Sequence, residues 1–398
     1  MATLIHPQLA PSRVRDASER LVIMAIFGTR PEAVKLAPVV RALRESHEFL
    51  PIVVVTGQHR ELLDQVMQLF GITPDIDLDI MRPEQSLVDI VTRGLAGLHG
   101  ALDEVHPDMV LVQGDAHSAF IGALAAFYHR IPIGHVEAGL RTHDKYQPFP
   151  EELNRRMTSA LADVHFAPTP RAKSNLLREG IPVEAIFVTG NTVIDALAHV
   201  RELSDVPPVP GVPVTLHRRL LLVTTHRREN WGEPLRETYL ALRDILDRFA
   251  DLELVFSVHP NPAVRRIAED ALREHPRAHL IQPPPYASWI HLMRRAYLIL
   301  TDSGGIQEEA VALGRPVLVL RRLTERPEGV EVGAMRLVGT DRMKILQEAT
   351  RLLTDASAYQ AMTQVRNPFG DGRASERILQ ALRFYNRKST QRPEEFAG

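Results

Sequence analysis

The chain has 398 residues, a formal net charge of −2 and no cysteine, which excludes disulfides, thiolate catalysis and metal sites built from cysteine. Its 44% hydrophobic residues can fill the cores of two domains, and the absence of a basic excess argues against a nucleic-acid partner. No apolar run approaches the ~18 residues of a membrane span, and residues 1–20 lack the apolar segment of a signal peptide. These features predict a cytoplasmic protein without a membrane partner.

Short apolar runs alternate with helical patterns along the whole chain. This alternation is typical of parallel βαβ units in a doubly wound sheet. After an expected flexible extension at 1–20, the first half has strand-like runs at 21–27, 52–56, 109–112, 131–136, 164–167 and 186–188. The second half has such runs at 220–224, 252–258, 279–281, 297–300, 316–320 and 336–338. We therefore predict an α/β fold with two Rossmann-like domains.

A proline-rich segment at 201–215 separates the two series of strands and is predicted to be a linker. It divides an N-terminal domain at 21–200 from a C-terminal domain at 216–366, and we expect a flexible tail at 389–398. Two domains joined by one hinge imply a cleft between them. In doubly wound sheets ligands bind at the carboxyl ends of the strands, so we expect the site to face this cleft.

Polar residues in the first half fall where predicted strands end. Arg30 and Lys35 lie near a helix N-terminus, where cations are unfavourable unless an anion is bound. Asp115 and Glu137 follow two strands, and Glu151 comes after the next loop. A single carboxylate of this kind is usually a helix cap or a surface acid. Three at one sheet edge predict catalysis, because close carboxylates push their pKa values apart and supply an acid and a base.

The second half contains a predicted phosphate-binding turn. Ser303, Gly304 and Gly305 follow a buried strand, and a helix is expected from Ile306 to about Leu313. Glu308 is then expected in the first helical turn, where its carboxylate could accept hydrogen bonds from the vicinal hydroxyls of a ribose. An ordinary strand, turn and capped helix would have the same pattern.

Three more side chains of the second half are expected near this turn. His226 and Arg227 follow the strand at 220–224, and Arg326 lies in an arginine-rich loop after 316–320. We expect these three side chains to contact phosphate. The chain has no G-x-G-x-x-G fingerprint after a strand, no P-loop and no zinc-binding H-E-x-x-H, so neither a cofactor nor a metal is expected.

Taken together, these motifs give the chain a family resemblance. The sequence resembles the non-hydrolysing UDP-N-acetylglucosamine 2-epimerases. The resemblance spans residues 21 to about 385, and its motifs are Gly28-Thr29-Arg30-Pro31-Glu32, Gly134-His135-Val136-Glu137-Ala138-Gly139-Leu140-Arg141-Thr142, Pro150-Glu151-Glu152-x-Asn154-Arg155, Val188-Thr189-Gly190-Asn191-Thr192-Val193-Ile194-Asp195, Thr225-His226-Arg227-Arg228-Glu229-Asn230, Thr301-Asp302-Ser303-Gly304-Gly305-Ile306-Gln307-Glu308-Glu309 and Asn367-Pro368-Phe369-Gly370-Asp371-Gly372.

The resemblance implies a GT-B fold, a UDP-sugar as substrate, a homodimer and a role in cell-surface polysaccharide synthesis. It also implies that the helix at 367–388 crosses back to the N-terminal domain. The catalytic residues that it implies are Asp115, Glu137, Glu151 and His226. The substrate-binding residues that it implies are Arg30, Lys35, Arg155, Arg227, Ser303, Gly304, Gly305, Glu308 and Arg326.

The residues themselves support the same chemistry. Carbon 2 of a sugar carries no acidic proton, so inversion there needs either oxidation beside it or elimination of UDP to a glycal followed by re-addition. The chain has no nicotinamide motif, whereas carboxylates and cations suit elimination. A hydrolysing epimerase and a GT-B glycosyltransferase remain as alternatives, and a nucleotide-sugar sensor without turnover is a third. The products formed on incubation with UDP-N-acetylglucosamine alone distinguish these four activities.

Overall fold

The computed structural model describes residues 3–4, 20–57, 60–82, 85–203, 206–213, 218–227 and 230–398. The chain forms two compact units: unit 1 comprises Met1–Ala198 and Gly370–Gly398, and unit 2 comprises His199–Phe369. No helix in the described ranges is long and apolar enough to cross a membrane. The prediction of an α/β fold with two doubly wound sheets is confirmed, because each unit contains one such sheet.

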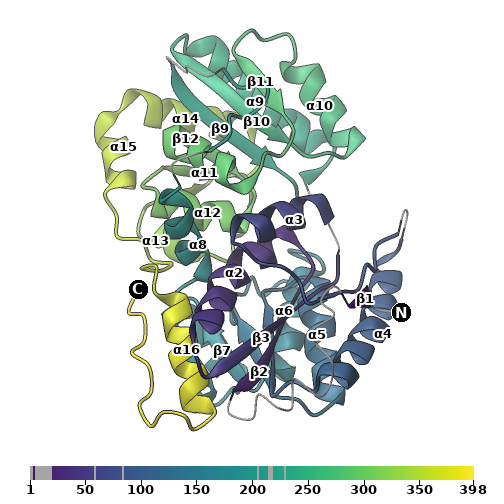
Figure 1. Cartoon of the computed structure of the whole chain (residues 1–398). Helices are drawn as coiled ribbons and strands as arrows, with labels where there is room; N and C mark the ends of the chain where they lie inside the picture. Colours follow the sequence, from purple (N-terminus) through teal and green to yellow (C-terminus); the bar gives the residue numbers. More distant parts are fainter. Residues whose placement is uncertain are drawn as a thin grey trace. The chain divides into compact units, whose positions relative to one another are not determined.

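Unit 1 is built on an eight-stranded sheet whose strands are parallel, except that β1 runs antiparallel to β4 (Figure 1). In spatial order the strands are β1 (Thr3–Leu4), β4 (Ile76–Asp77), β3 (Phe49–Val55), β2 (Leu21–Phe27), β5 (Met109–Gln113), β6 (Ile133–Val136), β7 (Val164–Ala167) and β8 (Ile186–Val188). The expectation of a flexible extension at 1–20 did not include β1, because a strand of two residues has no detectable pattern. Residues 1–2 and 5–19 lie outside the described residues.

The helices of unit 1 cover this sheet and leave its strands almost fully buried. They are α2 (Arg30–Glu45), α3 (Arg60–Leu69), α4 (Leu87–Val105), α5 (His117–Tyr128), α6 (Glu151–Leu161), α7 (Pro170–Arg178), α8 (Thr192–Arg201), α16 (Ala374–Tyr385) and a short 3-10 turn at Val183–Ala185. The boundary between the units falls within α8. Burial on both faces explains why the strands appear in the sequence as continuous apolar runs.

Unit 2 contains a six-stranded parallel sheet. In spatial order its strands are β11 (Ala278–Ile281), β10 (Leu252–Val258), β9 (Arg219–Thr225), β12 (Ala296–Thr301), β13 (Val317–Val319) and β14 (Met335–Leu337). The chain leaves β9 toward β10 on one side and later returns to β12 on the other. The carboxyl ends of β9 and β12 therefore form the switch point at which doubly wound sheets bind their ligands.

The helices of unit 2 pack on this sheet around a core of leucine, valine and aromatic side chains. They are α9 (Glu233–Arg248), α10 (Pro262–Leu272), α11 (Tyr286–Arg295), α12 (Gly304–Ala312), α13 (Pro327–Glu331), α14 (Arg342–Thr354) and α15 (Ala356–Thr363). Part of the predicted linker also contacts this unit: Ser288 donates a hydrogen bond to the Pro207 carbonyl at 3.0 Å, and Val209 is buried.

The last residues of the chain belong to unit 1, where α16 packs against α2 (Figure 1). Asp195 on α8 accepts hydrogen bonds from the backbone N–H groups of Ala374 (3.1 Å) and Ser375 (2.8 Å), and it thereby caps α16. The expectation of a flexible tail at 389–398 does not match the contacts of this segment. Phe396 is 4% exposed and donates its N–H to the Val188 carbonyl at 2.8 Å, because the edge strand β8 offers both an acceptor and an apolar surface.

Candidate functional site

Two of the three predicted catalytic carboxylates follow neighbouring parallel strands of unit 1. Asp115 comes after β5 and Glu137 after β6, and these strands are paired up to Gln113 and Val136. Gly114 turns the chain with φ +71°, whereas Glu137 itself has φ +64°. Positive φ is uncommon for a residue with a side chain, and such strain is concentrated at functional sites.

Arg155 on α6 holds the two carboxylates together. Its guanidinium is ion-paired with Asp115, donates a hydrogen bond to the Glu137 backbone carbonyl at 2.6 Å and lies 3.4 Å from Oε1 of Glu137. Only 3% of the Arg155 side chain is exposed. The family resemblance implies that Arg155 binds substrate; in the structure its guanidinium contacts both acids.

Lys35 and Asn191 complete the surroundings of Glu137. The ammonium group of Lys35, on α2, forms an ion pair with Oε2 of Glu137, and the amide of Asn191 donates to the same oxygen at 2.9 Å. Together with Arg155, these donors contact both oxygens of the Glu137 carboxylate. Asn191 belongs to a family motif but was not predicted as a site residue. Its place just after β8, at the same sheet edge, is the signal that could have identified it.

The acids differ in how far water can reach them. About a third of the Asp115 side chain is exposed (29%), compared with 3% for Glu137. Glu151 is half-buried and begins α6, one helical turn before Arg155. Arg30 is half-buried at the first position of α2, the helix that carries Lys35. The structure thus brings Lys35, Asp115, Glu137 and Arg155 into contact. Arg30 lies on the same helix as Lys35 (α2), and Glu151 lies on the same helix as Arg155 (α6).

Buried polar groups hold the loops that carry these residues. Glu32 accepts hydrogen bonds from the N–H groups of Gly28 (3.0 Å) and Thr29 (2.8 Å) and from the Ser118 hydroxyl (2.6 Å), so it joins the start of α2 to the start of α5. Burial raises the pKa of Glu32 despite these donors. Burial also places the pKa of His135 well below its usual value, so the neutral ring donates from Nε2 to the Gly114 carbonyl at 2.8 Å and fixes the turn before Asp115.

In unit 2, His226 lies at the switch point between β9 and β12. Its Nδ1 is 2.8 Å from Oδ1 of Asp302, a fully buried residue that also accepts the backbone N–H groups of His226 (3.0 Å) and Arg227 (3.0 Å). Burial alone would raise the pKa of Asp302, but the charge and the hydrogen bonds of His226 and Arg227 outweigh burial and lower it. An ionised Asp302 fixes the proton of His226 on Nδ1 and leaves the lone pair on Nε2.

The helix that carries the glycine motif begins earlier than predicted. Ser303 is its N-cap and α12 starts at Gly304, so the two glycines form the first helical turn and Glu308 lies beyond it. The N–H groups of this first turn have no acceptor within the helix, which suits an anion. A Cβ at Gly304 would lie 2.3 Å from Nη1 of Arg326, whereas one at Gly305 would meet nothing within 4 Å. Close approach of Arg326 therefore requires glycine at 304.

Arg326 is tied into a buried charge network. It donates from Nε to Glu308 at 2.5 Å, and its Nη1 is 3.3 Å from Glu325, which also pairs with Arg321 at 2.8 Å. Burial would raise the pKa of Glu325, but the charges of Arg321, Arg326 and Arg227 hold it far below its usual range. Glu308 is 1% exposed, and the neighbouring Glu309 accepts a hydrogen bond from the Tyr286 hydroxyl at 2.7 Å.

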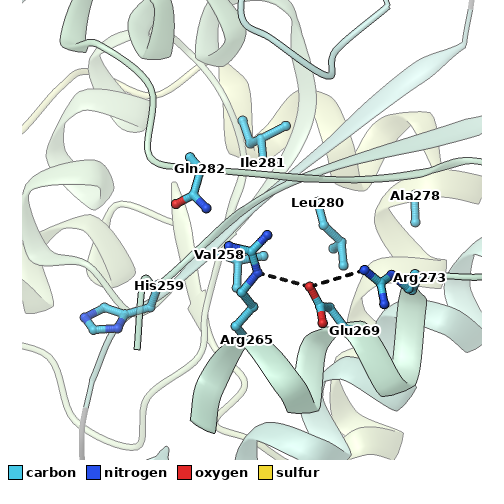
Figure 2. Close-up of a pocket in the computed structure, with 9 residues that line it drawn as sticks. All are labelled: Val258, His259, Arg265, Glu269, Arg273, Ala278, Leu280, Ile281 and Gln282. Carbon is cyan, nitrogen blue, oxygen red and sulfur yellow. Dashed lines mark hydrogen bonds and ion pairs between the residues drawn. The ribbon is translucent and has the colours of Figure 1, made fainter. Parts of the chain in front are cut away.

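A cavity of about 260 Å³ lies between α10 and the edge strand β11 of unit 2 (Figure 2). Glu269 bridges Arg265 (3.0 Å) and Arg273 (3.9 Å) on one side of it. Two further lining residues follow the carboxyl ends of strands: His259 comes after β10 and Gln282 after β11. Neither His226 nor the α12 residues line this cavity, which lies on the opposite side of β9 from β12.

Comparison with known proteins assigns the chain to a family. The family model for UDP-N-acetylglucosamine 2-epimerase matches residues 41–383. The UDP-N-acetylglucosamine 2-epimerase of Bacillus subtilis is 49% identical over 381 residues, which cover 96% of this chain and 100% of the relative. A structure of S. aureus MnaA with UDP has a TM-score of 0.91 at 47% identity and covers 95% of this chain and 100% of that one.

The Neisseria meningitidis UDP-GlcNAc 2-epimerase, solved with UDP-GlcNAc bound, is 44% identical with a TM-score of 0.87 and covers 91% of this chain and 99% of its own. These likenesses confirm the predicted fold class, two Rossmann-like units of the GT-B type. The chain belongs to the UDP-N-acetylglucosamine 2-epimerase family.

Proposed function

We propose that this protein interconverts UDP-N-acetylglucosamine and UDP-N-acetylmannosamine by eliminating UDP, forming a glycal and adding UDP back after reprotonation at C2. The observation that carries this proposal is the pair of carboxylates, Asp115 and Glu137, bridged by the buried Arg155 at the edge of one sheet. The substrates named for the family members support the identity of the sugar nucleotide.

The proposal divides the work between the two units. Unit 1 supplies acid and base groups for C2, with Arg30 and Lys35 as further cations. In unit 2 the first turn of α12 receives the diphosphate, and Arg227, Arg326 and His226 add positive charge or donors. The leaving diphosphate gains negative charge as the C1–O bond breaks, and fixed cations and N–H dipoles stabilise such charge best. Glu308 is proposed to bind the ribose.

Among the acids, exposure and charge suggest different roles. Glu137 is buried and contacts three donor side chains, Lys35, Arg155 and Asn191. Asp115 is partly open to water and pairs with Arg155, and Glu151 begins its helix half-buried. We therefore assign proton transfer at the sugar to Asp115 and Glu151, and the orientation of Lys35 and Arg155 to Glu137.

The test is incubation of the pure protein with UDP-N-acetylglucosamine alone, followed by chromatography of the products. An equilibrium mixture with UDP-N-acetylmannosamine supports the proposal. Free N-acetylmannosamine with UDP would instead indicate a hydrolysing epimerase, and unchanged substrate would leave a glycosyltransferase or a sensor.

The roles of the acids are tested with Asp115→Asn, Glu137→Gln and Glu151→Gln. Loss of a general acid or base costs about 10²–10⁴ in rate, so we expect this loss in Asp115→Asn and Glu151→Gln and a smaller one in Glu137→Gln, whereas UDP affinity should stay close to that of the wild type. Near wild-type rates in all three variants would reject the catalytic assignment.

A further inference from the structure

A cluster of metal-ligating side chains lies outside the candidate site, between two helices of unit 1. His99 and Asp103 are one helical turn apart on α4, and His129 is the C-terminal cap of α5. These two helices pack against each other. One ligand atom from each residue lies within 4.8 Å of the other two. We propose that this cluster, His99, Asp103 and His129, is a binding site for a divalent first-row transition-metal ion.

The spacing of the donor atoms supports a metal rather than a chance surface contact. Nδ1 of His99 and Nε2 of His129 are 2.9 Å apart. Nε2 of His99 is 3.5 Å from Oδ2 of Asp103, and Nδ1 of His129 is 3.4 Å from Oδ1. Only one proton fits between two imidazole nitrogens, so a cation that accepts both lone pairs can replace it. Asp103 therefore faces the ring nitrogens that do not pair with each other, and the cluster can offer one donor atom from each residue within 4.8 Å of the other two.

The geometry also indicates which ions fit best. An ion about 2.1 Å from two nitrogens that are 2.9 Å apart makes an angle of about 90° with them. Two neighbouring donor atoms of an octahedral or tetragonal ion make this angle at the ion. In a tetrahedral Zn²⁺ site the angle is wider, and two donor atoms lie about 3.4 Å apart. Two imidazoles and a carboxylate are donors that Cu²⁺ and Ni²⁺ accept, and affinities generally rise from Ni²⁺ to Cu²⁺. We therefore expect Cu²⁺ to bind most tightly, then Ni²⁺ and Zn²⁺.

No metal is expected from the sequence, because the zinc motif H-E-x-x-H requires two ligating histidines on one helix. Here the third ligand comes from a second helix. The side chain of His129 is 17% exposed and held against α4, while those of His99 (67%) and Asp103 (56%) are open to solvent. Water can therefore fill the remaining coordination positions, and an ion can enter without any rearrangement of the core.

The experiment is isothermal titration of the full chain, without a histidine tag, with CuCl₂, NiCl₂ and ZnCl₂. We expect one ion per chain, and an affinity that falls by at least about tenfold in His99→Ala and in His129→Ala. His275→Ala is the matched control, because His275 forms a comparable pair with Asp247 (3.4 Å) in unit 2 but is not part of the three-residue cluster. This control should bind as the wild type does.

An electron paramagnetic resonance spectrum of the Cu²⁺ complex provides a second measurement that does not depend on activity. It should show coupling to two nitrogens in the wild type and a different pattern in His129→Ala. Absence of binding at millimolar metal, equal affinity of the wild type and His129→Ala, or a spectrum without nitrogen coupling would each overturn the proposal. Circular dichroism checks that the surface variants are folded.

Discussion

Arg155 is the residue on which the arrangement of the acids depends most, and Arg155→Met tests this directly. The variant keeps most of the volume but loses the hydrogen bond to the Glu137 carbonyl and the ion pairs with Asp115 and Glu137. Removing one partner of a buried ion pair costs about 3–5 kcal/mol, because a buried charge is left without compensation. Lys35 and Asn191 still contact Glu137, and Asp115 can be hydrated, so we expect the lower end, about 3 kcal/mol.

The assay is urea unfolding followed by circular dichroism, with Arg156→Met as the matched control. Arg156 is the next residue of α6, half its side chain is exposed, and it lies 3.6 Å from Glu179. A surface pair of this kind contributes at most about 1 kcal/mol. A loss below 1 kcal/mol in Arg155→Met, or equal losses in the two variants, would refute the bridging role. UDP affinity should be unchanged in Arg155→Met, and a large loss would restore the original assignment to substrate binding.

Three further predictions concern other parts of the chain. Because the pKa of Asp302 is lowered in the fold, its ionised form stabilises unit 2 above the usual carboxyl pKa of 3.8, and this contribution is lost as the pH falls further. Asp302→Asn should therefore weaken the loss of the free energy of unfolding at acid pH, and an unchanged pH dependence would contradict this. Glu308→Gln should weaken UDP binding in calorimetry by about 1–3 kcal/mol and more than Glu309→Gln does; the reverse order would move the ribose contact to Glu309. Phe396→Ala should cost about 3 kcal/mol in urea unfolding, since the ring is 4% exposed, and a loss below 1 kcal/mol would show that the tail adds little.

The strands and the fold could be predicted from the sequence because parallel strands buried on both faces leave long apolar runs. The predicted run at 252–258 is identical to β10, and the run at 164–167 is identical to β7. The two-residue strands β1 and β4 escaped prediction, since a pattern needs more residues than they contain. Glycine disfavours helix interiors, so the start of α12 was predicted after Gly305 instead of at Gly304.

The site was predictable as a set of strand ends but not as a set of contacts. Parallel neighbouring strands bring Asp115 and Glu137 to one edge, and this follows from their positions after β5 and β6. The partner of each acid depends on how α2 and α6 pack, and no local pattern encodes that packing. Lys35 and Arg155 were therefore predicted as substrate ligands, although both contact Glu137 in the structure. The proposed homodimer stays a prediction.

The most direct test of the proposed mechanism is the fate of the hydrogen at C2. Turnover of UDP-N-acetylglucosamine by the wild-type protein in heavy water, followed by mass spectrometry and proton NMR of the UDP-N-acetylmannosamine formed, measures whether that hydrogen exchanges with solvent. Elimination through a glycal requires deprotonation at C2, so we predict one deuterium at C2 of every product molecule. Product that retains its original C2 hydrogen would contradict the mechanism and the role assigned to the carboxylates.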